Sequence, residues 1–312
     1  MTVVDQQLEW QRAPDPTPGR REVVVRVRAA GLNGADMLQV QGLYPAPAGA
    51  PPDIPGLELA GEVIEIGSAV TRFGPGDRVM AVVAGGGQAE LAVVHERHLL
   101  PVPEGLSWEE AGGFPEVFTT AFDALFTQCE LLIGERVCVH GAAGGVGTAG
   151  VQLAVAAGAG CRLATVPRSR SPGRRGSSRC HRRHAGGLRR PRTVRRRARV
   201  MGAPNLPGDL ESLATGGRVA VIGVGGGAKT ELSLLALMGK RARIHGSTLR
   251  ARSLEEKATV ARAVERHVVP LLSHDVVRVP VAGTFSMGDA GEAYERFRSG
   301  GKFGKIVLLV GG

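Results

Sequence analysis

The stretch from Gly134 to Ala154 constrains the fold more than any other part of the chain. Val137 and Val139 lie among small residues, as in a short buried strand, and apolar residues with helical spacing follow a glycine cluster. A strand, a glycine-rich turn and a helix in this order begin the βαβ unit that binds dinucleotides. The turn reads Gly141-Ala-Ala-Gly-Gly-Val-Gly147, a variant of Gly-x-Gly-x-x-Gly. It predicts a cofactor site, and a glycine turn without a ligand is the alternative.

Glycine has a physical purpose in such a turn. Without side chains, the backbone N–H groups approach a pyrophosphate closely, and the N-terminus of the next helix favours negative charge. Gly147 lacks a Cβ at the point where helix and sheet must pack.

Length and charge limit the protein class. A chain of 312 residues suits two domains, and it contains no apolar run of transmembrane length or secretory leader, so we expect a cytoplasmic protein. Its four cysteines lack the spacing of a zinc ribbon. The net charge of +10 is local, because residues 161–200 hold fifteen arginines and no Asp or Glu, and the remaining residues sum to −5.

The flanking regions have different patterns. Short strands joined by Gly/Pro turns between Val23 and Val102 predict an antiparallel, barrel-like domain. Ser107 and Glu110 predict a helix start. Near the end of the chain, residues 277–280 are predicted to form a strand.

Six short motifs occur together and in order. They are Asn33-x-x-Asp36, Gly42-Leu-Tyr44, Gly56-Leu-Glu58, Gly74-Pro-Gly-Asp-Arg78, Thr119-Thr-Ala121 and Ala142-Ala-Gly-Gly-Val-Gly147. With them the chain resembles the zinc-free quinone oxidoreductases of the medium-chain dehydrogenase/reductase superfamily, except over about residues 160–200.

The resemblance implies an α/β fold. A Rossmann-type doubly wound parallel sheet, residues 113–245, would be joined to a GroES-like β-barrel catalytic domain that is split into residues 1–112 and 246–312. The family also implies a homodimer. The zinc-using relatives carry a Cys and a His-Glu pair where this chain reads Leu32-Asn33 and Leu57-Glu58. Without thiolate or imidazole, no tetrahedral zinc site is expected.

The resemblance also implies the function and the site. It implies NADPH as cofactor and hydride delivery to a small quinone or another α,β-unsaturated carbonyl. The implied catalytic residues are Asn33, Tyr44 and Thr120. The implied cofactor-binding residues are Gly141, Ala142, Gly144, Gly145, Val146, Gly147, Gly223, Val224, Gly225, Phe303 and Lys305.

Alternatives remain open for the function and for single residues. An enoyl-thioester reductase has the same fold, and a nonenzymatic polyanion-binding protein would use the arginine-rich segment. Asn33 alternatively forms a turn, Tyr44 packs in a loop, and Thr120 bonds its own helix backbone. For His140 a core role is favoured over that of a base.

The arginine-rich residues 168–199 lack the apolar periodicity that a Rossmann domain needs there. One hypothesis is a coding frame displaced by one base: Arg195-Arg-Arg-Ala-Arg199 has codons that, read one base later, give Asp-Val-Val-Leu, a strand pattern. A disordered basic loop and a nucleic-acid-binding insertion are the alternatives. Residues 161–200 contain no aromatic side chain, which disfavours a nucleic-acid module. If the chain is read as printed, we expect the central strands to lack partners and the protein to be destabilised.

Overall fold

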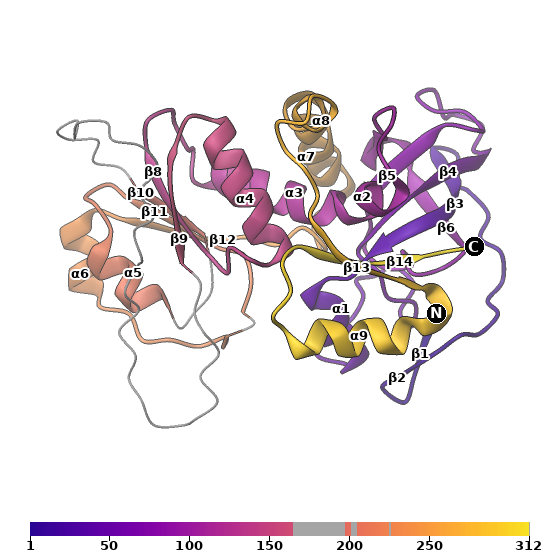
Figure 1. Cartoon of the computed structure of the whole chain (residues 1–312), viewed down its shortest axis with the longest axis horizontal. Helices are drawn as coiled ribbons and strands as arrows, with labels where there is room; N and C mark the ends of the chain where they lie inside the picture. Colours follow the sequence, from indigo (N-terminus) through magenta and orange to yellow (C-terminus); the bar gives the residue numbers. More distant parts are fainter. Residues whose placement is uncertain (165–196, 201–204, 225, 312) are drawn as a thin grey trace. The chain divides into compact units, whose positions relative to one another are not determined.

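The computed structural model describes residues 1–164, 197–200, 205–224 and 226–311 (Figure 1). The chain forms two compact units, which we call unit 1 (Met1–Thr119 and Leu249–Gly312) and unit 2 (Thr120–Thr248). Unit 1 is therefore discontinuous in sequence. The predicted boundaries, 112/113 and 245/246, lie near these divisions.

Unit 1 is built on a seven-stranded sheet in the order β13-β14-β3-β4-β5-β7, with β6 also paired to β3. Its strands are β3 (Glu22–Gly31), β4 (Glu58–Ile66), β5 (Arg78–Val82), β6 (Leu91–His95), β7 (Leu99–Pro101), β13 (Val281–Ser286) and β14 (Lys305–Leu309). All pairs are antiparallel except β13 with β14. Val23, Val25 and Val27 point to the same face of β3, are buried and belong to the hydrophobic core of unit 1.

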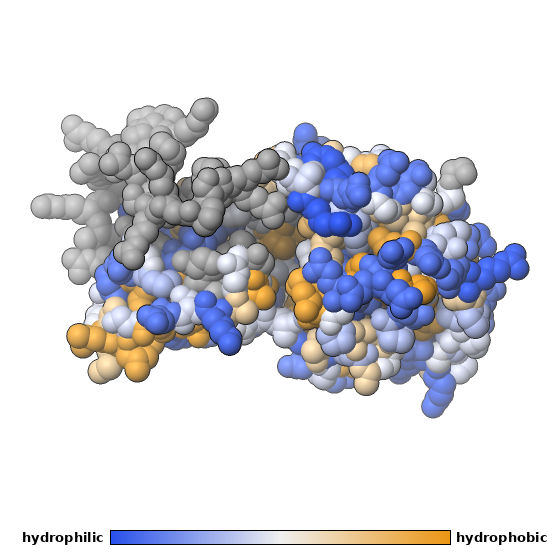
Figure 2. All heavy atoms as spheres, turned by 90° about the horizontal axis from the view of Figure 1, so that it is seen from below, coloured by the Kyte–Doolittle hydropathy of each residue, from blue (hydrophilic) through white to orange (hydrophobic). Residues whose placement is uncertain are grey.

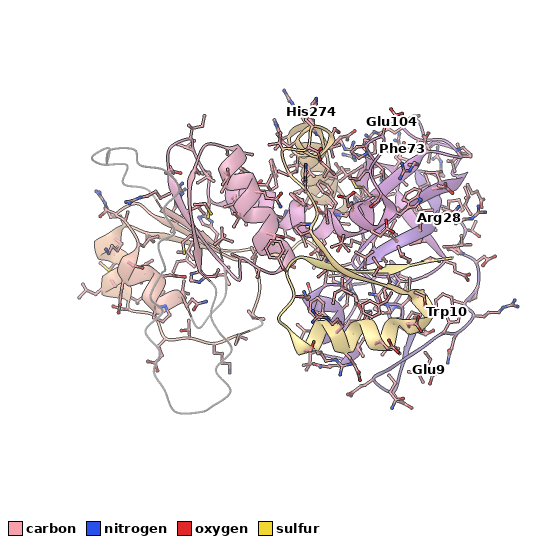
Figure 3. All side chains as sticks on the ribbon, viewed as in Figure 1. Glu9, Trp10, Arg28, Phe73, Glu104 and His274 are labelled. Carbon is pink, nitrogen blue, oxygen red and sulfur yellow. The ribbon has the colours of Figure 1, made fainter. Side chains whose placement is uncertain are left out.

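Short strands and helices complete unit 1. The strands β1 (Thr2–Val4) and β2 (Gln7–Glu9) form a separate hairpin. The helices are α1 (Gly34–Val40), η1 (Glu96–His98), α2 (Trp108–Gly113), α3 (Pro115–Phe122, which crosses into unit 2), α7 (Leu254–His267), α8 (Val269–Ser273), η4 (Met287–Asp289) and α9 (Ala290–Ser299). The predicted start at Ser107 is confirmed, because its Oγ accepts a hydrogen bond from the Glu110 N–H at 3.2 Å. Trp10, which follows β2, is half exposed at the surface (Figure 3).

The strand predicted at residues 277–280 is wrong. In the structure β13 begins at Val281, after Pro280. Proline has no N–H for a ladder, and pairing starts where the Lys305 N–H reaches the Pro280 carbonyl at 2.7 Å.

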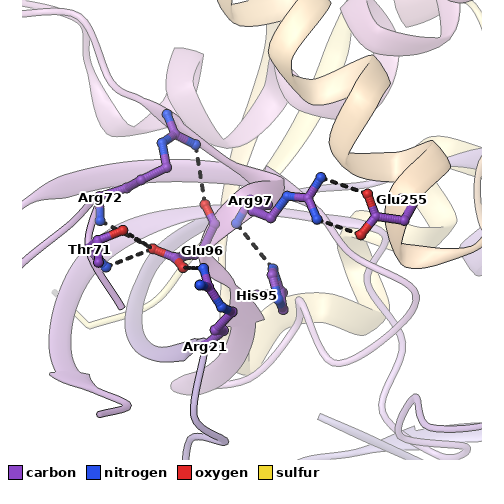
Figure 4. Close-up of polar contacts among 7 residues, drawn as sticks. All are labelled: Arg21, Thr71, Arg72, His95, Glu96, Arg97 and Glu255. Carbon is purple, nitrogen blue, oxygen red and sulfur yellow. Dashed lines mark hydrogen bonds and ion pairs between the residues drawn. The ribbon is translucent and has the colours of Figure 1, made fainter. Parts of the chain in front are cut away.

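Three arginines of unit 1, Arg21, Arg72 and Arg97, make contacts that hold its elements together (Figure 4). The buried Glu96 accepts hydrogen bonds from the Thr71 N–H at 2.8 Å, the Arg72 N–H at 3.2 Å and the Arg21 guanidinium at 2.8 Å. Burial raises the pKa of Glu96, but these donors outweigh burial and hold it below its usual range. Arg97 binds Glu255 through both carboxylate oxygens, at 2.5 and 2.7 Å, and so ties η1 to α7. These arginines therefore serve the fold of unit 1.

The described residues of unit 2 form a parallel sheet of five strands in the order β12-β11-β10-β8-β9. Its strands are β8 (Arg136–His140), β9 (Gly160–Ala164), β10 (Arg197–Val200), β11 (Arg218–Val221) and β12 (Arg243–Gly246). Its helices are η2 (Asp123–Gln128), α4 (Gly145–Ala156), α5 (Leu206–Ser212) and α6 (Leu234–Lys240). The order corresponds to strands 6-5-4-1-2 of a doubly wound sheet.

The expectation that the central strands would lack partners is wrong for β10. This strand pairs in parallel with β8 on one side and with β11 on the other. Ladders form between backbone N–H and C=O groups, so an arginine-rich segment can still provide them. The hypotheses on residues 165–196, including the displaced frame, the disordered loop and polyanion binding, lie outside the described residues.

Helix α6 exposes an apolar surface. Leu234, Leu235 and Met238 are 68%, 80% and 71% exposed. Figure 2 shows hydrophobic residues gathered at its left edge, the side on which α6 lies in Figure 1. Among the described strands, the neighbouring β12 is also an edge of the sheet.

Candidate cofactor and active site

The glycine turn of unit 2 joins β8 to α4. Gly141 follows His140 with φ +59°, a conformation that favours glycine, and its carbonyl accepts the Gly144 N–H at 2.9 Å. A Cβ on Gly147 would overlap the Gly141 carbonyl oxygen and would lie 2.7 Å from the Ala142 Cα. The first turn of α4 can therefore approach the loop only with glycine at position 147.

The N-terminus of α4 is suited to an anion. The first N–H groups of a helix have no partner within it, and they carry the positive end of the helix dipole. The N-cap Gly144 provides no side-chain cap, and the first turn has no acidic residue. The predicted residues Gly141, Ala142, Gly144, Gly145 and Val146 thus form a turn whose amides and dipole fit a pyrophosphate.

His140 connects this turn to α5. Its Nε2 lies 3.0 Å from Oδ1 of Asp209, and the two residues are 8% and 3% exposed. The two residues lie 69 positions apart, so no local signal in the sequence pairs them. The contact agrees with the core role favoured for His140 and adds Asp209, which the sequence reasoning missed.

The other predicted cofactor residues are less enclosed. Gly223 and Val224 are exposed beyond the end of β11, and Gly225 lies outside the described residues. Phe303 is 64% exposed, whereas Lys305 is buried at 3%. These residues stay predictions as cofactor ligands.

Two of the three predicted catalytic residues, Tyr44 and Thr120, have different surroundings. The Tyr44 ring packs against the Arg250 guanidinium, 4.9 Å from the ring centre, and its carbonyl accepts from Arg250 at 2.9 Å. Thr120 lies half-buried on α3. Their catalytic roles stay predictions.

The third, Asn33, belongs to a buried polar cluster in unit 1. Glu58 is fully buried, and its Oε1 lies 2.9 Å from the Asn33 Nδ2 and 2.5 Å from the Lys305 Nζ. Lys305 also donates to the Asn33 Oδ1 at 2.8 Å. The cluster brings together the N-cap residue of α1, the first residue of β4 and the first residue of β14. Sequence reasoning singled out Asn33 and Lys305 but did not connect them through Glu58.

Asp36 closes the first turn of α1. Its Oδ2 accepts the Asn33 N–H at 2.8 Å, so the Asn-x-x-Asp spacing caps the start of this helix. Burial raises the pKa of Asp36 from its ordinary value of 3.8 to about 7, and hydrogen bonding by Asn33 and the nearby Lys305 charge oppose the shift only in part. Asp36 therefore takes up a proton near neutral pH.

This shift predicts how stability depends on pH. Between about pH 4 and pH 7 the native Asp36 holds a proton that the unfolded chain has lost. The contribution of the protonated side chain to the free energy of unfolding is therefore complete below this window and is lost as the pH rises through it. Asp36→Asn cannot ionise at this position. We therefore expect the difference between its Tm and that of the wild type to increase by several degrees in favour of the variant as the pH rises through the window. Thermal melts across this range measure the difference.

Asp77→Asn is the matched control. Asp77 likewise accepts a backbone N–H from three residues earlier, Gly74 at 2.8 Å, but it is exposed. A constant difference between Asp36→Asn and the wild type across the range would contradict the prediction.

The donor chemistry of the cluster does not fit zinc. Leu32 and Leu57 offer no side-chain ligand, and the cluster presents oxygen atoms around an ammonium group. Within the described ranges there is no group of three His, Cys, Asp or Glu side chains placed to hold a metal ion.

Comparisons with known proteins agree with this architecture. Residues 19–104 match the alcohol dehydrogenase GroES-like domain, and residues 198–308 match the zinc-binding dehydrogenase domain. With both domains and the fold described above, the chain belongs to the medium-chain dehydrogenase/reductase superfamily, a class of oxidoreductases.

Within this class, quinone oxidoreductases are similar over nearly the whole chain. The rat quinone oxidoreductase is 29% identical over 307 residues, which cover 95% of this chain and 91% of the rat protein. The structure described as the quinone oxidoreductase from Thermus thermophilus and its complex with NADPH is 29% identical, with a TM-score of 0.74 over 97% of this chain and 96% of that one.

Part of the chain is also similar to a much larger enzyme. Polyketide synthase GfsB of Streptomyces halstedii is 41% identical over 147 residues, 47% of this chain. The matched stretch makes up 2% of the length of the synthase.

Proposed function

We propose that the protein is an NADPH-dependent, zinc-independent reductase that delivers hydride to quinones or other α,β-unsaturated carbonyls. The observation that carries the proposal is the glycine turn at residues 141–147, which leads directly into the N-terminus of α4. No side chain caps this N-terminus, so its backbone N–H groups can bind an anion. The similarity to a quinone oxidoreductase described in complex with NADPH supports this choice of cofactor and substrate.

The residues of the chain have distinct tasks in this proposal. When bound, the nicotinamide supplies the hydride. Gly144, Gly145 and Val146 would contact the pyrophosphate, Gly145 and Val146 through their backbone N–H groups, since the Gly144 N–H is donated to the Gly141 carbonyl. Asn33 and Tyr44, with Thr120, are proposed to line the nicotinamide side of the site and to orient the acceptor, which lowers the entropic part of the barrier.

The direct test is oxidation of NADPH with a simple quinone, followed by the absorbance of the reduced nicotinamide. We expect turnover, and we expect it to survive dialysis against EDTA, because the proposed site uses no metal. NADH in place of NADPH tests the cofactor preference. A protein that binds NADPH but turns over no quinone would contradict the substrate class, and loss of activity with EDTA would contradict zinc independence.

A second candidate is an enoyl-thioester reductase. Three polyketide synthases are 41%, 43% and 42% identical over 47%, 46% and 49% of this chain. Turnover of an enoyl-CoA well above that of quinones would favour this alternative.

A nonenzymatic function, the binding of polyanions, is the remaining alternative. It predicts salt-dependent binding that is lost when residues 168–199 are removed.

The quaternary structure and the cellular location stay predictions. A second copy of the chain would cover the exposed residues of α6 beside the edge strand β12, and this supports the proposed homodimer. In the part of the chain that the structure describes, the helices are too short or too polar to cross a membrane. A cytoplasmic location stays our proposal.

A further inference from the structure

The ammonium group of Lys305 has all its donors engaged inside unit 1. Its Nζ donates to the Leu32 carbonyl at 2.7 Å, to the Asn33 Oδ1 at 2.8 Å and to the Glu58 Oε1 at 2.5 Å. An ammonium group carries three protons, so these contacts use all of them. Lys305 therefore has no donor left for a direct contact with a bound molecule while the cluster is intact.

The same contacts fix the orientation of the Asn33 amide. Lys305 can only donate, which identifies the atom facing it as Oδ1. On the other side, Nδ2 donates to the Glu58 carboxylate at 2.9 Å and to the Gly31 carbonyl at 3.2 Å. Both N–H groups of the amide are thus occupied, and the remaining valence of Asn33 is a lone pair on Oδ1.

Glu58 anchors this arrangement to a further element. Its Oε2 accepts the Glu116 N–H, in the first turn of α3, at 2.8 Å. Glu58 and Lys305 are 0% and 3% exposed, so neither charge is solvated and each depends on the other. The geometry of Asn33 is therefore set by a buried ion pair whose members lie 247 residues apart.

We propose that Lys305 is a positioning residue that acts through Asn33, and that Asn33 meets the bound molecule only as a hydrogen-bond acceptor. Asn33 then takes an N–H or O–H group, such as a carboxamide N–H. A carbonyl oxygen that gains charge during reduction must find its donor elsewhere. This inference rests on the proposed function, and it replaces a direct cofactor contact by Lys305.

The test uses Lys305→Ala in the full chain with and without n-propylammonium, which supplies the four heavy atoms that the substitution removes. We expect a Tm lower by about 10 °C and a kcat/KM for quinone lower by about tenfold or more, with an NADPH Kd within about threefold of the wild type. The amine is expected to restore Tm and kcat/KM together. Lys302→Ala, a half-buried lysine outside the cluster, should show neither loss nor rescue.

A spectroscopic readout separates this proposal from the proposed enzymatic activity. The chain contains two asparagines, Asn33 and Asn205, so selective ¹⁵N-asparagine labelling gives two side-chain amides. In the wild type the Asn33 amide protons should exchange slowly with solvent. Exchange should become faster in Lys305→Ala and slow again with the amine, while Asn205, in unit 2, is unchanged. This result does not depend on quinone turnover.

A charge-balanced variant covers the case in which Lys305→Ala does not fold. Lys305→Met with Glu58→Gln removes both charges and should recover most of the Tm but not kcat/KM, because the Asn33 Oδ1 then has no ammonium donor to hold it. Recovery of both would reduce Lys305 to a structural residue and overturn the proposal. An NADPH Kd raised about tenfold or more in either variant, or an Asn33 amide that exchanges rapidly in the wild type, would overturn it as well.

Discussion

Gly147→Ala is expected to weaken NADPH binding by about 1,000-fold, equivalent to about 4 kcal/mol. The new Cβ would overlap the Gly141 carbonyl oxygen and press on the Ala142 Cα, so the turn must move away from the first turn of α4. The amides that hold the pyrophosphate then no longer converge. Quenching of protein fluorescence or calorimetric titration with NADPH measures the loss.

Gly239→Ala provides the control for this substitution. Gly239 lies on α6 in the same unit, and a Cβ there would meet nothing within 4 Å. Alanine is favoured over glycine within a helix by about 0.5–1 kcal/mol, so this variant should melt slightly higher and bind NADPH like the wild type. Wild-type affinity in Gly147→Ala would show that the cofactor does not use the turn at residues 141–147.

Arg218→Met is expected to destabilise the protein by about 3–5 kcal/mol. The Arg218 guanidinium forms an ion pair with Glu135, and both residues are almost fully buried, at 1% and 3% exposure. Arg218 begins β11 and Glu135 precedes β8, so the pair joins the two strands that flank β10. Without Arg218 the Glu135 carboxylate is buried and uncompensated. Thermal or denaturant unfolding measures the loss.

Two further variants test the cause. Arg218→Met with Glu135→Gln should recover part of the stability, because the unpaired charge is removed while an oxygen remains for the Leu132 N–H, which Glu135 accepts at 3.0 Å. Arg243→Met breaks the neighbouring pair with Glu130, whose side chains are 50% and 62% exposed, and should leave Tm nearly unchanged. Equal losses in Arg218→Met and Arg243→Met would refute the assignment to burial.

Local patterns in the sequence predicted much of the fold. The spacing around Val137 and Val139 indicated β8, the glycines indicated the turn, and the structure places α4 directly after it. The α1 cap at Asn33 and Asp36 and the α2 start at Ser107 likewise depend on side chains three residues apart. Such features are predictable because the residues that form them are only a few positions apart in the sequence.

The pairings that organise the candidate sites have no such signal. Lys305 and Glu58 are 247 residues apart, Arg218 and Glu135 are 83 apart, and His140 and Asp209 are 69 apart. Each pair forms only when the sheets bring distant segments together. The strand β10 was missed for a different reason. Its side chains lack the apolar pattern of a buried strand, but its pairing with β8 and β11 depends on backbone hydrogen bonds.

The split of unit 1 has a consequence for how the chain reaches its native state. β3 lies between β4 and β14, and β14 is made after the whole of unit 2 has left the ribosome. Until then residues 29–31 at the end of β3 lack the partner that β14 provides, because β6 pairs with β3 only over residues 22–26. Glu58 also lacks its counterion, so the N-terminal segment remains incomplete and prone to aggregation. A circular permutant that begins at Leu249 and links Gly312 to Met1 would make the barrel in one continuous piece, and it should mature with less dependence on chaperones.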